Sequence, residues 1–149
     1  MSDLVAKARM LIYAPAAEVF GSFVCPKKIT QFWLSSSSGP LKMDAQVEWQ
    51  FMVPGATEHV AVVAFEDARH LAFVWSKSGL KIEITFRMIE ERSTVVSVEV
   101  RGVIDELTLP QVVDATEGFS IVLCDLKTLL ETGLSAHLVR DKAALSQIA

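Results

Sequence analysis

Residues 112–130 read VVDATEGFSIVLCDLKTLL, the longest stretch of this chain with helical periodicity. Polar side chains fill most of the positions that the helical pattern leaves free, and Gly133 follows where a glycine commonly ends a helix. The sequence therefore predicts one continuous helix over residues 112–131 with a broad apolar face that needs a packing partner. The apolar face consists of Val112, Ala115, Phe119, Val122, Leu123, Leu126, Leu129 and Leu130.

The chain before this helix alternates apolar and polar residues with a period of two, which is typical of strands with one buried face. Pro54-Gly55 and Ser78-Gly79 supply turns, as in an antiparallel meander. The predicted strands are residues 4–13, 45–51, 57–65, 71–75, 80–88 and 96–101.

Two short helices are predicted between the first and second strands. Pro15 and Pro26 suit the first turn of a helix, and apolar residues follow each of them at helical spacing. The run SSSSGP at residues 35–40 is expected to be a surface loop. Residues 134–149 have mixed charge and are expected to form a short, loosely attached tail.

Composition limits the classes of protein to which the chain can belong. Its 149 residues fit a single domain spanning 1–149, and 51% of them are hydrophobic, so a folded core is expected. A net charge of −4 with scattered Lys and Arg does not favour nucleic-acid binding. No apolar run approaches the roughly 18 residues of a membrane span, and the N-terminus lacks a signal peptide, so a cytoplasmic location is expected. Cys25 and Cys124 are expected to be reduced and buried.

Three stretches resemble one known family. They are IYAPAAEVF at residues 12–20 with Cys25-Pro26 and ITQFW at 29–33, FEDARHLAFVW at 65–75, and EGF at 117–119 with the leucines of the long helix and ETG at 131–133. These residues resemble the START-like (SRPBCC) superfamily, in the branch named after the activator of the heat-shock-protein-90 ATPase. Phe119 stands where such proteins often carry tryptophan, and the glycine-rich stretch many of them have after the second helix is reduced here to Gly39.

The resemblance implies an α+β helix-grip fold. In this fold a curved antiparallel sheet of six to seven strands wraps around the long C-terminal helix, and two short helices follow the first strand. Physical reasoning leaves a packed core and a ligand cavity equally open for the space between sheet and helix. The resemblance favours a cavity that holds a small hydrophobic or aromatic ligand. Ile121 and Cys124 lie on the helix side opposite the apolar stripe and could form a dimer contact, so a monomer or a homodimer is expected.

The expected cavity lining follows from the inward phase of the strands and the helix. Asp125 lies about 100° from the centre of the apolar stripe, where its carboxylate would either reach the cavity mouth as a polar contact or sit as a solvated flank residue. Tyr13, Gln50, Ser76 and Thr94 are further polar groups that could orient a ligand. The lining set is Trp49, Phe51, Phe73, Trp75, Ile84, Phe86, Val98, Phe119, Leu123 and Leu126.

Catalytic and cofactor signals are weak. His59, His70 and His137 lack the spacing of metal ligands, and no phosphate-binding glycine motif occurs. We therefore expect no metal and no cofactor, and the sequence assigns no catalytic residue.

Three functions compete at this stage. A ligand-binding protein leads. The family resemblance also allows a polyketide cyclase- or dehydratase-like enzyme, or an interaction protein that stimulates a chaperone ATPase.

Overall fold

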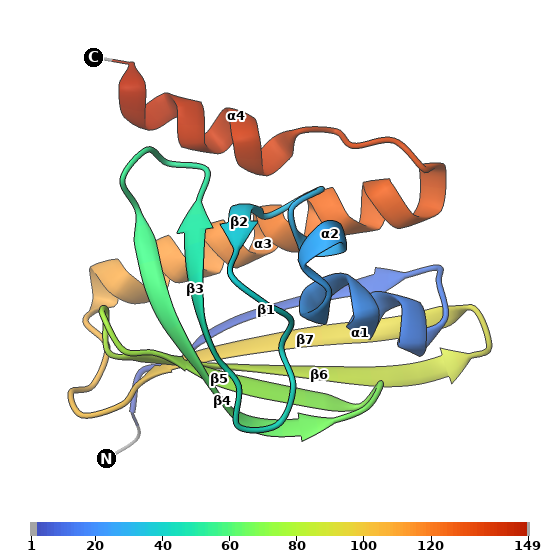
Figure 1. Cartoon of the computed structure of the whole chain (residues 1–149), viewed down its shortest axis with the longest axis horizontal. Coiled ribbons are helices and arrows are strands. Elements are labelled where there is room, and N and C mark those ends of the chain that lie inside the picture. Colours follow the sequence, from blue (N-terminus) through green and yellow to red (C-terminus); the bar gives the residue numbers. More distant parts are fainter. Residues whose placement is uncertain (1–2, 149) are drawn as a thin grey trace.

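The computed structural model describes residues 3–148, and its centre is a seven-stranded antiparallel sheet in the order β1-β7-β6-β5-β4-β3-β2. Strands β2 to β7 form a meander, and β1 joins it at the β7 edge. Figure 1 shows α3 lying across one face of this sheet, with α1 and α2 on the same side. The elements are β1 (Ala6–Ile12), α1 (Ala16–Val24), α2 (Pro26–Ile29), β2 (Leu34–Ser37), β3 (Gln46–Phe51), β4 (Thr57–Glu66), β5 (His70–Trp75), β6 (Leu80–Glu90), β7 (Ser93–Gly102), α3 (Leu109–Thr132), α4 (Leu138–Ala144) and a short 3-10 helix (Leu145–Gln147).

Helix α3 confirms the long helix that the periodicity predicted. It begins three residues earlier because Thr108 and Gln111 form a reciprocal capping box, with the Gln111 N–H donating to Thr108 Oγ1 at 3.3 Å. It ends at Gly133, whose φ of 79° suits glycine and whose N–H donates to the Leu129 carbonyl at 2.8 Å. Leu123 and Leu126 are fully buried against the sheet. The predicted α+β helix-grip fold is therefore confirmed.

The predicted loop at residues 35–40 is partly wrong, because β2 occupies its first half. Ser36 pairs with Gln50 and Ser37 pairs with Trp49 at the edge of the sheet. A strand at the edge of a sheet is partly exposed to water and need not alternate apolar with polar residues. The run of serines therefore carried no sequence pattern that predicts a strand. Met88 ends the predicted strand 80–88 and continues the alternation of Ile84 and Phe86, but it is 63% exposed because β6 runs on past the core.

Asp125 is neither at a cavity mouth nor on a solvated flank, because it is only 1% exposed. Its Oδ2 accepts a hydrogen bond of 3.0 Å from the Val139 N–H at the start of α4. The tail thus returns across α3, with Ala143 buried and Lys142 paired with Glu117. The hydrogen bond to Glu117 raises the pKa of Lys142 above its ordinary value. The helical phase of Asp125 on α3 could not predict its burial, because the segment that covers it is α4.

Within residues 3–148, no helix is both long enough and apolar enough to cross a membrane.

Candidate ligand site

Six aromatic side chains gather between α3 and the strands β3 and β5. Neighbouring rings contact edge to face, as for Trp33 and Trp49, whose centroids lie 5.1 Å apart. Trp75 is stacked on Phe119 of α3 at 6.0 Å with an interplanar angle of 18°. We call the six residues the aromatic cluster: Trp33, Trp49, Phe51, Phe73, Trp75 and Phe119.

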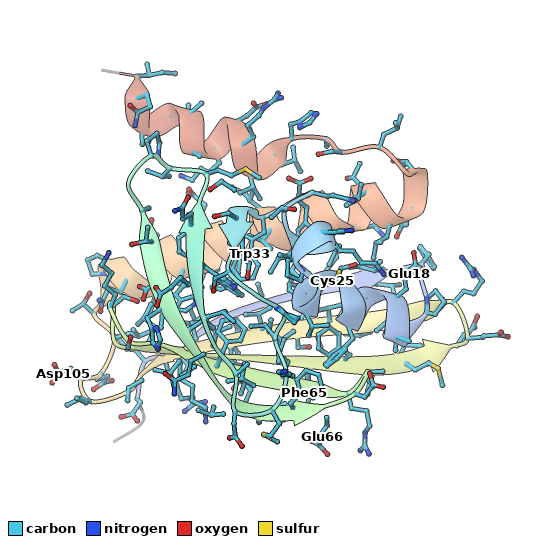
Figure 2. The ribbon with its side chains drawn as sticks, viewed as in Figure 1. Glu18, Cys25, Trp33, Phe65, Glu66 and Asp105 are labelled. Atoms are coloured by element: carbon cyan, nitrogen blue, oxygen red, sulfur yellow. The ribbon has the colours of Figure 1, made fainter. Side chains whose placement is uncertain are left out.

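Trp33 is the cluster member that the sequence reasoning missed. It is 4% exposed and contacts rings from β3, β5 and α3, and Figure 2 shows it among the side chains between α3 and the sheet. It follows α2 in a short irregular segment, so no strand or helix phase assigned it an inward face. The motif ITQFW at residues 29–33 was the signal that could have found it.

Phe86, which was assigned to the same lining, belongs to a separate group of rings beneath α1. Its ring lies 5.2 Å from Phe20 and 5.8 Å from Phe23. Phe23 also contacts Trp33 at 6.1 Å and so joins this group to the aromatic cluster. The rest of the expected lining is buried core around both groups: Ile84, Val98, Leu123 and Leu126.

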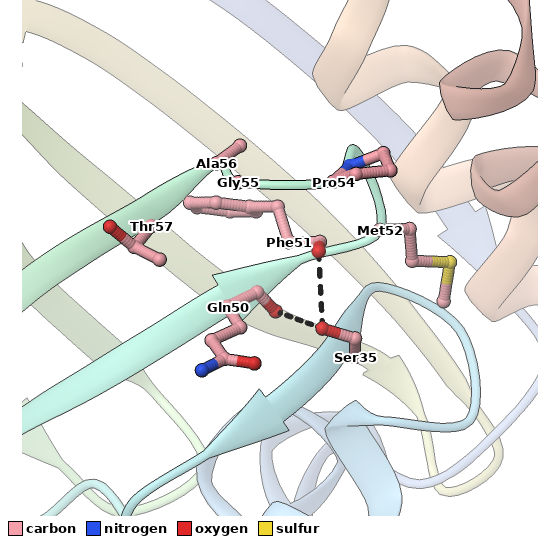
Figure 3. A pocket seen from close by; sticks show the side chains of 8 residues that line it. All are labelled: Ser35, Gln50, Phe51, Met52, Pro54, Gly55, Ala56 and Thr57. Carbon is pink, nitrogen blue, oxygen red and sulfur yellow. Dashed lines mark hydrogen bonds between the residues drawn. The ribbon is translucent and has the colours of Figure 1, made fainter. Parts of the chain in front are cut away.

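A pocket of about 370 Å³ lies beside the aromatic cluster, at the hairpin that joins β3 to β4. Ser35 Oγ closes one side of it by donating to the carbonyls of Gln50 at 3.0 Å and Phe51 at 3.1 Å (Figure 3). The pocket is partly open to solvent. Its lining residues are Ser35, Gln50, Phe51, Met52, Pro54, Gly55, Ala56 and Thr57.

Phe51 connects the pocket with the aromatic cluster. It lines the pocket, and its ring lies 5.4 Å from Trp75 on the cluster side. Phe51 is only half-buried, whereas Trp49 and Phe73 are at most 1% exposed. The rings of the cluster contact one another closely, and the hairpin pocket lies beyond Phe51 at the edge of the cluster.

The cluster also contains polar atoms that the sequence reasoning treated as part of an apolar lining. Among residues 3–148, Nε1 of Trp49 and Nε1 of Trp75 are buried without a hydrogen-bond partner, as is Oδ1 of Asp125. Leaving a buried donor unpaired typically costs about 1–3 kcal/mol. The hydrophobic phase of the strands does not reveal these two unpaired donors.

The other polar groups proposed to orient a ligand divide in the structure. Gln50 lines the hairpin pocket. Thr94 is buried, but its hydroxyl donates to the Ala14 carbonyl at 2.8 Å. Tyr13 is 57% exposed and lies under Lys127, and Ser76 is exposed.

Glu58 is a titratable side chain beside the aromatic cluster: it is 7% exposed and lies opposite Trp49 in the pairing of β3 with β4. Its carboxylate accepts hydrogen bonds from the N–H groups of Lys77 at 3.0 Å and Ser78 at 3.1 Å.

Two of the histidines form ion pairs elsewhere on the sheet. His59 pairs with Glu48 at 2.6 Å, and His70 pairs with Glu83 at 2.9 Å. In the part of the chain that the structure describes, no three His, Cys, Asp or Glu side chains converge to hold a metal ion. Cys25 and Cys124 are free thiols, as expected, but both are half-buried instead of buried.

A second pocket of about 300 Å³ lies between the two short helices and the end of α3. It is more polar than the hairpin pocket and includes the charged side chains Glu18 and Lys28. It is separate from the aromatic cluster, because none of the six cluster residues lines it.

The fold is shared with several solved structures. Protein SSP2350 from Staphylococcus saprophyticus has a TM-score of 0.77 and 29% identity over 89% of this chain and 95% of that chain. The Aha1 dimer from Colwellia psychrerythraea has a TM-score of 0.75 and 17% identity over 87% of this chain and 98% of that chain. DynU16, a protein in the dynemicin biosynthetic locus, has a TM-score of 0.77 and 18% identity over 90% of this chain, which spans 49% of DynU16.

A comparison with curated proteins finds no match. The family model described as "Activator of Hsp90 ATPase homolog 1-like protein" matches residues 13–131. This range runs from the end of β1 to the last turn of α3, so it includes the whole aromatic cluster and the hairpin pocket. The chain therefore belongs to the family of activator of Hsp90 ATPase homolog 1-like proteins, as its three sequence motifs indicated.

Proposed function

We propose that this protein binds a small aromatic ligand, which enters at the hairpin pocket and packs against the aromatic cluster. The observation that carries the proposal is the position of Phe51, which lines the pocket with one side and touches Trp75 with the other. A pocket of about 370 Å³ is within the size range of small-molecule sites, and such sites are mostly apolar with a few polar groups.

Movement of one side chain would extend the pocket into the cluster. Phe51 is half-buried and lies next to a turn that contains Gly55, so it is less confined than Trp49 or Phe73. A ligand ring that takes the place of the Phe51 ring would keep the edge-to-face contacts with Trp75 and Trp49. The ligand would thus replace one aromatic contact by another without opening an empty cavity.

Binding fits the site better than catalysis does, because all eight pocket residues and all six cluster residues are neutral. Acid–base chemistry needs a titratable group within hydrogen-bond reach of the reacting atom. The two buried carboxylates are instead engaged with backbone N–H groups, Asp125 with that of Val139 and Glu58 with those of Lys77 and Ser78. The likeness to a protein from the dynemicin biosynthetic locus is in keeping with a small-molecule ligand.

Tryptophan fluorescence offers a direct test, since all three tryptophans of the chain lie in the aromatic cluster. Naphthalene derivatives, flavones and long-chain fatty acids should be titrated separately. We expect the aromatic compounds to change the emission saturably. At about 100 times the dissociation constant, a ligand that binds only the folded state contributes about 2.7 kcal/mol, which raises the Tm by about 5–10 °C. An aromatic panel that changes neither emission nor Tm would contradict the proposal.

A matched pair of variants localises the site. Phe51→Leu removes the ring whose contacts with Trp75 the ligand must displace, and we expect it to strengthen binding by up to about tenfold. Phe65→Leu is the control, because Phe65 is another half-buried phenylalanine of the same sheet whose ring contacts Phe20 at 5.2 Å, outside the cluster. Equal effects of the two variants on affinity would place the ligand elsewhere.

A further inference from the structure

We propose that the indole N–H groups of Trp49 and Trp75 select the ligand, so that the protein prefers planar aromatic carbonyl compounds over hydrocarbons of the same shape. This inference rests on the proposed function, since it concerns the ligand that enters beside Phe51. It names the ligand's chemical class: an aromatic ring system with an oxygen atom that accepts hydrogen bonds.

The first support is the state of the two donors in this structure. A buried tryptophan N–H usually has a hydrogen-bond partner, yet Nε1 of Trp49 and Nε1 of Trp75 have none among the described residues. Trp49 is 1% exposed, so water does not reach its ring from outside. Each donor therefore gains a hydrogen bond when a ligand brings an acceptor into the cluster.

The second support is the arrangement of the two rings. Their centroids lie 6.2 Å apart and both rings contact Phe51, so a ligand that takes the place of the Phe51 ring would contact both indoles. A carbonyl oxygen has two lone pairs and can accept two hydrogen bonds, whereas a tryptophan N–H can only donate. The rings of Trp49 and Trp75 are in contact with those of Trp33, Phe51, Phe73 and Phe119. The cluster therefore combines aromatic surfaces with two hydrogen-bond donors that have no acceptor within the described residues.

The third support is that the two unpaired donors would distinguish ligands by their hydrogen-bonding groups and not by their size. Ligands without an acceptor leave the donors unpaired, and the site gains nothing at these atoms when they bind. Sites built around polar groups reject analogues that lack the matching partner more strongly than apolar pockets reject a change of size.

The test uses two compounds of nearly identical shape, acetylnaphthalene and isopropenylnaphthalene substituted at the same ring position. The second replaces the carbonyl oxygen by a CH₂ group. We expect wild-type protein to bind the acetyl compound about tenfold more tightly, as measured by isothermal titration calorimetry. Trp75→Phe and Trp49→Phe should each reduce this preference by about threefold or more. Phe65→Leu, which changes a ring outside the cluster that contacts Phe20, should leave the preference unchanged.

A second readout needs no variant that could perturb the fold. In ¹⁵N-labelled wild-type protein, the indole N–H resonances of Trp49 and Trp75 should move downfield with the acetyl compound and less with the isopropenyl compound. Equal affinities for both compounds, with no difference at these resonances, would overturn the inference and leave aromatic binding in place. If neither compound binds and no aromatic compound of the wider panel does, the proposed function itself fails.

Discussion

Replacing Asp125 by alanine removes the buried carboxylate that holds the start of α4 on α3. Its Oδ2 accepts a hydrogen bond of 3.0 Å from the Val139 N–H, and a hydrogen bond to a charged group contributes about 1.5–3 kcal/mol. The ion pair between Lys142 and Glu117 is largely exposed and adds little. With about 1.4 kcal/mol for each factor of ten, local opening of α4 should become about 10 to 100 times more frequent in Asp125→Ala.

Native-state hydrogen exchange measures this opening directly. We expect the amides of residues 139–143 to exchange about 10 to 100 times faster in Asp125→Ala, while the central strands β6 and β7 change little. Asp125→Asn keeps a side-chain oxygen that can accept from Val139 and should show a smaller effect. Asp141→Asn is the control, because it makes the same change of charge on α4 at an exposed pair with Arg140.

Two results would refute the reasoning about Asp125. Unchanged exchange over residues 139–143 would mean that the hydrogen bond to Val139 does not hold α4. Uniformly faster exchange throughout the sheet would mean that Asp125 acts on the stability of the whole core, so that α4 has no separate opening.

Two further predictions concern the packing and charge of α3. Leu126→Asp should abolish cooperative unfolding in a thermal melt, because Leu126 is 0% exposed and an unpaired core charge costs several kcal/mol; a folded, soluble variant would contradict the placement of this face. For Glu131, partial burial raises the pKa, but hydrogen bonds from Lys127 and from the Tyr13 N–H outweigh it and hold the pKa below its ordinary value of 4.5. The stabilisation by the Glu131 carboxylate is therefore present above about pH 4.5 and is lost as the pH falls through the lowered pKa. The difference in Tm between wild type and Glu131→Gln should consequently be smaller near pH 3 than near pH 7. A difference in Tm that does not change with pH would argue against a lowered pKa.

The sequence predicted the fold well where the pattern is local. The period of α3 and the alternation of β3, β5, β6 and β7 each depend on residues a few positions apart, and these elements appeared with bounds close to those expected. The prediction failed at β2, since an edge strand of serines carries no alternation. Met88 continues the alternation of β6, but this end of the strand lies past the core and Met88 is exposed. The sequence of a strand does not show where the elements packed against it end.

The candidate site was predictable only in outline. Trp49, Phe51, Phe73, Trp75 and Phe119 share an inward phase, which is why the sequence could group them. The same argument wrongly placed Phe86 with them, because periodicity assigns a face of the sheet and not a position along it.

Most of the elements and their inward faces were predictable from hydrophobic periodicity, because it is a property of neighbouring residues along the chain, and the three motifs indicated the family. Only the tertiary structure decided that Phe51 joins the hairpin pocket to the aromatic cluster and that α4 covers Asp125. It also decided that two buried indole N–H groups meet no acceptor within the described residues. Each of these facts depends on atoms from segments far apart in the sequence coming within a few ångströms of one another. Such contacts are set by the way the whole chain folds, which local periodicity does not describe.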